Sequence, residues 1–96
     1  MNLEFETTEE MEDIFREGYY DFSKRIIDVT LENLDATEEV HILEILAKDT
    51  GTLYEITLEP EDKIEVLKQN LKIIERFEDY ETCSKVIEAI RYLEQT

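Results

Sequence analysis

Residues 61–93 limit the fold more than any other part of this sequence, because they carry its clearest helical period. Apolar residues recur there at steps of three and four in two runs: Ile64, Leu67, Leu71, Ile74 and Phe77, then Tyr80, Cys83, Val86, Ile87, Ile90 and Leu93. Such spacing places the side chains of each run on one helix face. Glu78 and Asp79 separate the runs, so we predict an antiparallel helical hairpin over residues 61–95. A single helix that continues through Asp79 is the alternative.

The residues around this break form a further pattern. Glu78-Asp79-Tyr80-Glu81 is followed by Cys83-Ser84 and then by Val86, Ile90 and Leu93. Over residues 71–93 the pattern resembles the UVR motif, a short helical hairpin of nucleotide-excision-repair proteins and some protease adaptors, in which E-x-[YF]-E-x-A-A leads into a helix. Cys83-Ser84 stands where two alanines are usual, and the arginine-rich continuation of the second helix is largely missing.

The resemblance implies a hairpin that docks on another helical hairpin or on a partner protein. The implied contact residues are Tyr80, Val86, Ile90 and Leu93. An ordinary core hairpin produces the same pattern and is the alternative interpretation.

Two β-rich runs, residues 39–48 and 52–59, flank the short segment Asp49-Thr50-Gly51. This arrangement is typical of a β-hairpin, since glycine accepts the positive φ that a tight turn needs. A helix over residues 38–48 is the weaker alternative, because it would leave residues 52–59 without a partner strand. Two strands alone are marginally stable, which favours a third strand elsewhere in the chain.

Residues 24–33 supply that third strand in our interpretation. Apolar and polar residues alternate over residues 27–31, as they do in a half-buried strand, and β-branched residues are abundant. A helical spacing also runs through Phe22, Ile26 and Val29, so a helix is the alternative for this segment.

The N-terminal part predicts a short strand or extended arm followed by a helix. Residues 1–6 alternate between apolar and polar side chains. Thr7 and Glu10 have the spacing of a capping box, in which each side chain satisfies a free amide of the first helical turn. A helix therefore starts at Thr8, and Gly18 ends it, since glycine readily takes a left-handed conformation.

Length and composition favour one small globular domain that spans residues 1–96. Ninety-six residues are enough for a single core, and an apolar fraction of 42% is that of a folded chain. We therefore predict an α+β fold with an N-terminal helix, a three-stranded antiparallel meander, and a C-terminal antiparallel helical hairpin packed on the sheet.

The chain is strongly acidic, with 26 acidic and 10 basic residues and a net charge of −16. Nucleic-acid phosphates and anionic membranes repel such a surface, so direct binding to either is not expected, and a basic protein is the favoured partner. The N-terminal sequence lacks the basic and apolar regions of a signal peptide, no apolar run is as long as a membrane span, and a single cysteine excludes an internal disulfide. We expect a soluble protein of the cytoplasm.

Net negative charge is larger in the N-terminal half, because basic residues are few there. In this half Glu9, Asp13 and Glu17, with Asp21 if the helix continues, recur at steps of four. Like charges at this spacing destabilise a helix slightly. Because the chain carries them despite this cost, we consider these carboxylates candidates for binding a partner. We predict a partner-binding surface that includes two tyrosines as anchors: Glu9, Glu10, Glu12, Asp13, Glu17, Tyr19, Tyr20 and Asp21. A solvated face that only keeps the protein soluble is the alternative.

Basic residues form a counterpart stripe at Lys68, Lys72 and Arg76. One interpretation is that these residues meet the acidic half of the same chain or that of a second copy, the latter giving a homodimer held partly by charge. We favour the simpler interpretation, in which they pair with Glu65 and Glu75 on the same helix and contribute little.

No group of residues indicates catalysis, a cofactor or a metal. His41 is the only histidine, which excludes a zinc site of the usual composition, and it is expected at the surface. Cys83 lies in an apolar stripe, where a buried, unreactive thiol is expected. Four residues imitate calcium-loop positions, but the aspartate and glycine that such a loop needs are missing: Asn33, Asp35, Thr37 and Glu44.

Our first functional hypothesis is a non-enzymatic protein-binding regulator or inhibitor. In its most specific form the protein is an acidic nucleic-acid mimic that blocks a basic nucleic-acid-binding protein, as phage-encoded inhibitors do, a resemblance of composition and size only. The alternative is an adaptor or dimerisation module that acts through the UVR-like hairpin. A small-ligand or metal-binding domain is a third hypothesis, but the sequence does not indicate the pocket that it would require.

Overall fold

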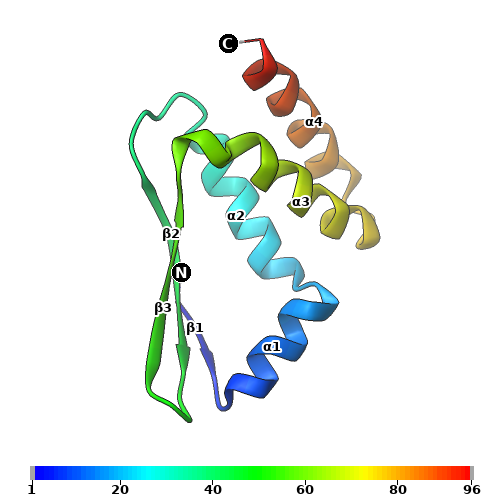
Figure 1. Ribbon diagram of the computed structural model, residues 1–96. Coiled ribbons are helices and arrows are strands. Elements are labelled where there is room, and N and C mark those ends of the chain that lie inside the picture. The colour runs from blue at the N-terminus through cyan, green and yellow to red at the C-terminus, as the bar shows by residue number, and fades with distance from the viewer. Residues whose placement is uncertain (1, 96) are drawn as a thin grey trace.

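The computed structural model describes residues 2–95, which form a mixed α+β structure (Figure 1). The order of the elements is β1 (Asn2–Phe5), α1 (Thr8–Glu17), α2 (Tyr20–Glu32), β2 (Val40–Ala47), β3 (Thr52–Leu58), a short 3-10 turn η1 (Pro60–Asp62), α3 (Lys63–Arg76) and α4 (Tyr80–Glu94). Within this part of the chain no helix is both long enough and apolar enough to cross a membrane.

The three strands form a mixed sheet in the order β1-β2-β3, so the predicted antiparallel meander is wrong. The β2–β3 pair is the antiparallel hairpin that the sequence indicated, and Gly51 in its turn has a φ of 68°. The third strand is β1, which pairs parallel to β2 with Leu3 opposite Ile45. Parallel neighbours need a long crossover connection, and α1 and α2 together provide it.

Residues 24–33, predicted as a strand, lie almost entirely in the helix α2. Ile26 and Val29 belong to the apolar cluster on the sheet side, whereas Ile27 belongs to the cluster on the side of α3 and α4. A helix buried on two sides has no single apolar stripe. Its apolar residues therefore imitated the alternation of a strand, although the helical spacing through Phe22 was also present.

The structure has three layers, with α2 between the sheet and the pair α3–α4 (Figure 1). The first apolar cluster lies between the sheet and the helices α1 and α2: Phe5, Met11, Ile26, Val29, Ile42, Leu43, Ile45 and Leu58. The second joins α2 to the hairpin: Ile27, Leu67, Ile74, Cys83, Val86, Ala89 and Ile90. The hairpin thus packs mainly on α2, and the prediction that it packs on the sheet is wrong.

The helical hairpin itself is confirmed, and a turn at residues 77–79 excludes a single unbroken helix. Glu78 N–H donates to Glu75 O at 3.1 Å, and Asp79 N–H to Ile74 O at 3.5 Å. These two bonds form a Schellman motif, in which the left-handed position is usually glycine. Glu78 occupies that position with a φ of 59°.

Local signals correctly predicted both ends of α1. The Thr7 side chain accepts a hydrogen bond from Glu10 N–H at 3.1 Å and caps the first turn. At the other end Gly18 has a φ of 92°, which interrupts the helical backbone before α2 begins.

Candidate protein-interaction surface

The acidic residues of α1 lie on its outer side. Met11 is buried toward the sheet, whereas all acidic residues of α1 are exposed: Glu9, Glu10, Glu12, Asp13 and Glu17. Only Asp13 has an ion pair among the described residues, with Arg16 Nη1 at 2.9 Å. We call these five residues, together with the exposed Asp21 on α2, the acidic face.

The acidic face is not a single straight row. Glu9, Asp13 and Glu17 are in phase on α1, but the helix ends at Gly18 and Asp21 belongs to the first turn of α2. Asp21 would extend the row only if α1 continued through Gly18, and the helix does not continue. Along α1 the three carboxylates are separated by four residues each, or about 6 Å of helix rise per step.

Asp49, in the turn between β2 and β3, fixes the start of α1 relative to the sheet. Its carboxylate accepts hydrogen bonds from Thr8 N–H at 3.0 Å and from the Thr8 hydroxyl at 2.9 Å. The bond from the Thr8 backbone is the main reason that the pKa of Asp49 lies below its ordinary value. Next to it, Lys48 Nζ lies 3.2 Å from Glu6 and 3.5 Å from Glu4, so β1 is tied to the same corner.

The two tyrosines predicted as partner anchors face inward. Tyr19 is half-buried, and its ring centroid lies 6.2 Å from that of Phe15. Tyr20 donates a hydrogen bond of 2.6 Å from its hydroxyl to Asp79, and this bond raises the pKa of Tyr20 to about 12. Both residues make contacts within this chain, and their role as partner anchors stays a prediction.

Two exposed rings lie at the turn between α3 and α4, Phe77 and Tyr80, which the sequence analysis placed in the inner stripes. Half of Phe77 and 65% of Tyr80 are exposed. The Phe77 ring packs edge-on against Tyr20 with centroids 5.3 Å apart. Their position beside the polar Glu78-Asp79 turn could have indicated their exposure, because residues at the end of a helical stripe pack less against the partner helix.

The apolar face that the UVR resemblance assigned to a partner is largely covered within the chain. Val86 and Ile90 belong to the apolar cluster shared with α2 and α3, and Leu93 packs against it as a partly buried residue. Of the implied contact residues, Tyr80 is exposed.

The basic residues of α3 do not form the expected pairs within their helix. Lys68, Lys72 and Arg76 are exposed and have no ion pair within residues 2–95. The Glu65 carboxylate accepts a hydrogen bond from Gln69 at 3.0 Å instead.

The loop that imitates a calcium loop is organised around a lysine. The buried Lys63 ammonium donates to the carbonyl oxygens of Leu34 at 2.9 Å and Ala36 at 2.6 Å. The two carbonyl oxygens that would coordinate a bound metal ion therefore bind the ammonium group of Lys63. Among the described residues no group of three or more His, Cys, Asp or Glu side chains is placed to hold a metal ion.

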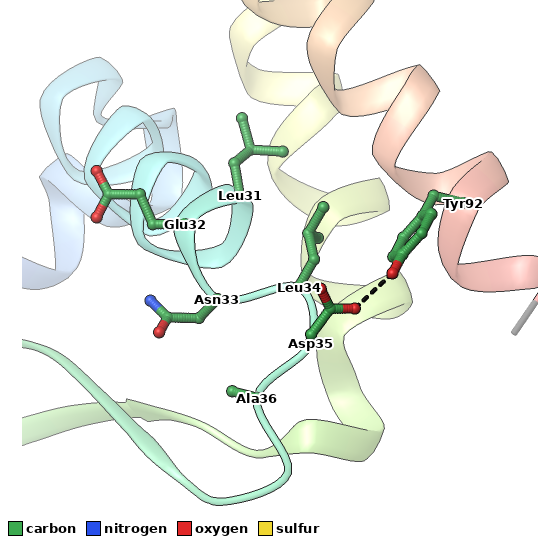
Figure 2. A pocket seen from close by; sticks show the side chains of 7 residues that line it. All are labelled: Leu31, Glu32, Asn33, Leu34, Asp35, Ala36 and Tyr92. Carbon is green, nitrogen blue, oxygen red and sulfur yellow. Dashed lines mark hydrogen bonds between the residues drawn. The ribbon is translucent and has the colours of Figure 1, made fainter.

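A shallow pocket of about 490 Å³ lies beside this loop, between the end of α2 and α4 (Figure 2). Its lining combines Leu31 and Leu34 with Glu32 and Asp35, and the Tyr92 hydroxyl donates a short hydrogen bond to Asp35 across it. The pocket is open, and its hydrogen-bonding groups at Asp35 and Tyr92 already satisfy each other, so it presents no converging set of groups for a small molecule.

His41 and Cys83 are placed as the sequence predicted. His41 is exposed on β2, with Nδ1 3.2 Å from the Glu55 carboxylate. Cys83 is buried, and burial raises the pKa of its thiol, with the nearby Glu75 and Asp79 adding to the effect. A thiol with a raised pKa stays protonated and is a poor nucleophile.

Comparison with protein-family models, with curated proteins and with solved structures finds no match to this chain. The resemblance to the UVR motif therefore depends on its residues alone.

Proposed function

We propose that this protein is a non-enzymatic regulator that binds a basic, nucleic-acid-handling protein through the acidic face and thereby shields the site where that protein holds DNA or RNA. The observation that supports this most directly is the exposure of every carboxylate on α1, of which only Asp13 is ion-paired within the part of the chain that the structure describes. Exposed carboxylates about 6 Å apart along a helix offer a row of negative charge to a groove built for phosphates. Such a regulator would act in the cytoplasm with its partner.

Pull-down with the purified protein at low and high salt identifies the partner for the test. The purified partner is then bound to labelled duplex DNA, and this protein is added as competitor. Displacement of the DNA is expected, and it weakens as salt rises, because exposed charges are screened over about 8–10 Å at physiological ionic strength. Displacement that does not change with salt would contradict a charge-based interface.

Two variants of equal net charge locate the interaction. The first neutralises the acidic face of α1: Glu9→Gln, Glu12→Gln, Asp13→Asn and Glu17→Gln. The second neutralises exposed carboxylates elsewhere: Glu61→Gln, Glu65→Gln, Glu88→Gln and Glu94→Gln. Only the first should lose displacement. Equal loss in both would mean that overall charge, and not this surface, attracts the partner.

The adaptor function is a second proposal, and it needs a different surface from the one that the sequence indicated. Since Val86 and Ile90 are buried, an apolar contact through α4 would have to use its exposed residues Tyr80 and Ile87. Binding of this kind is expected to survive high salt. A homodimer in which Lys68 and Lys72 face the acidic face of a second copy would instead dissociate at high salt, which sedimentation velocity measures.

A further inference from the structure

The turn between α3 and α4 brings exposed apolar rings and unpaired negative charge to one place. We define the hairpin tip as the residues Phe77, Glu78, Asp79, Tyr80 and Glu81. Phe77 and Tyr80 stand three residues apart on this turn and are among the most exposed large hydrophobic residues described. The other exposed ring on α4, Tyr92, is engaged with Asp35, so the tip is where free aromatic surface gathers.

Hydrogen bonds hold the tip in one conformation. Asp79 accepts from the Tyr20 hydroxyl at 2.6 Å, from the Thr82 hydroxyl at 2.7 Å and from Thr82 N–H at 3.2 Å. Tyr20 also supports the Phe77 ring from the side. A surface that is already ordered loses little entropy when a partner binds.

The net charge around the two rings is negative, although the exposed Arg76 directly precedes Phe77. Glu75, Glu78 and Glu81 are exposed on the hairpin, and of these only Glu81 has an ion pair, a 3.6 Å contact with Lys85. Glu78 stands where a Schellman motif usually has glycine. A carboxylate is thus present at the tip despite a backbone conformation that disfavours any side chain.

The tip is also next to the acidic face. Arg76, the last residue of α3, lies against Gly18 at the α1–α2 junction, and Tyr20 joins α2 to Asp79. The carboxylates of Glu17 and Asp21 flank that same junction. Elements far apart in the sequence therefore contribute rings and carboxylates to neighbouring surface.

We propose that the hairpin tip is the apolar anchor of the partner-binding surface, with Phe77 and Tyr80 docking a basic, arginine-bearing segment of the partner protein while the surrounding carboxylates meet its charges. This inference rests on the proposed function and adds the residues and the partner chemistry. Charge complementarity selects the occupant: arginine stacks on aromatic rings and pairs with carboxylates, and a second copy of this acidic chain would bring like charge to the tip.

The test uses two synthetic peptides of the same length and positive charge, one built of arginine and leucine and the other of lysine and glycine. Binding to the full-length protein is measured by fluorescence anisotropy. Tyr80→Ser should weaken binding of the arginine peptide about tenfold and leave the lysine peptide unchanged. Phe77→Leu, which removes the ring but keeps apolar volume, should act in the same direction.

Leu53→Ser is the matched control, because Leu53 is a comparably exposed apolar residue on β3 in the sheet layer, on the other side of α2 from the hairpin. Equal binding by Tyr80→Ser and the wild type, or an equal loss with Leu53→Ser, would overturn the proposal. So would self-association of the wild type that Tyr80→Ser abolishes, since the occupant would then be a second copy. Circular dichroism and thermal unfolding establish that each variant is folded.

The α1 charge variant, measured with the same peptides, separates this inference from the proposed function. If that variant loses the arginine peptide and Tyr80→Ser does not, the acidic face binds basic partners without the tip, and the inference fails alone. If Tyr80→Ser loses the peptide and the α1 variant keeps it, the tip is supported and the role of the acidic face is overturned.

Discussion

The Tyr20 hydroxyl donates a 2.6 Å hydrogen bond to the carboxylate of Asp79, the N-cap residue of α4, and so joins α2 to the start of α4 across 59 residues of sequence. This bond is the largest cause of two opposite pKa shifts: it raises the pKa of Tyr20 to about 12 and lowers that of Asp79. Both shifts favour the folded state between the two titrations, where the tyrosine is neutral and the carboxylate is charged.

The dependence of stability on pH above pH 10 tests the Tyr20–Asp79 pair. Tyr20 stays protonated in the folded protein up to about 12, whereas in the unfolded chain it ionises near 10.0, so its contribution to stability is complete below pH 10 and is lost as pH rises toward 12. In Tyr20→Phe this loss should be absent, and one late-titrating tyrosine should disappear from the absorbance titration. Tyr92→Phe should remove a second late-titrating tyrosine, because Asp35 also raises the pKa of Tyr92. An unchanged titration in Tyr20→Phe would show that the bond is not formed in solution.

Two isoleucines three residues apart on α4 test which side of the hairpin is core. Ile90 is buried in the cluster shared with α2 and α3, whereas 41% of Ile87 is exposed. Ile90→Glu should leave the chain largely unfolded, because it places a charge without a partner in the apolar interior. Ile87→Glu should change the free energy of unfolding by about 0.5 kcal/mol or less. Urea unfolding measures both, and similar values would mean that the packing described for α4 is wrong.

Glu78→Gly should leave the protein equally stable or make it more stable, by up to about 1 kcal/mol. The φ of Glu78 is 59°, and a left-handed residue with a side chain is disfavoured by roughly that amount, partly offset by the greater freedom of glycine in the unfolded chain. Thermal unfolding measures the change. A clear loss of stability would indicate that the Glu78 side chain makes a contact that strengthens the turn.

Gly18→Ala should destabilise the protein by about 1–2 kcal/mol, because alanine is strained at a φ of 92°. The added Cβ would also meet the end of the Arg76 side chain, which is flexible and can move away. Gly51→Ala provides the comparison, since its φ of 68° lies nearer to the left-handed helical region and nothing lies within 4 Å of the added Cβ. The alanine at Gly51 should therefore cost less than the one at Gly18, and the reverse order would contradict the junction geometry.

Ser23 offers a substitution that should stabilise the protein. Its side chain is fully buried in α2, and its hydroxyl has no hydrogen-bond partner among residues 2–95. Ser23→Ala removes an unsatisfied polar group from the interior, so the free energy of unfolding should rise, by about 1 kcal/mol. Thr30→Val, also fully buried, is the contrast, since the Thr30 hydroxyl donates to Ile26 O at 2.8 Å and its loss should bring no comparable gain. A drop in stability for Ser23→Ala would mean that the hydroxyl has a partner in solution.

Part of the candidate interaction surface could be predicted from the sequence. Exposure of the carboxylates on α1 follows from local rules, because a helix that begins at Thr8 and buries Met11 must turn Glu9 and Asp13 to solvent. The aromatic part could not be predicted in the same way. Tyr20 is oriented by its hydrogen bond to Asp79, which is distant in the sequence. Phe77 and Tyr80 belong to regular helical stripes, but they are exposed because no neighbouring helix extends far enough to cover them.

The sequence by itself determined the elements whose signals are local. These are the cap at Thr7, the end of α1 at Gly18, the β2–β3 hairpin around Gly51, and the two helices of the C-terminal hairpin. Each depends on interactions within one or two turns, which a short window of residues contains.

Tertiary structure alone decided the rest. Residues 24–33 are helical because α2 is buried between the sheet and the hairpin, and burial on two sides removes the single stripe that would have identified it. The four residues of β1 join the sheet parallel to β2 because the α1–α2 crossover returns the chain in the same direction. The pairing of distant segments sets both outcomes. A helical spacing through Phe22, Ile26 and Val29 was present but competed with a strand-like alternation, and no local pattern of residues indicated the parallel pairing of β1.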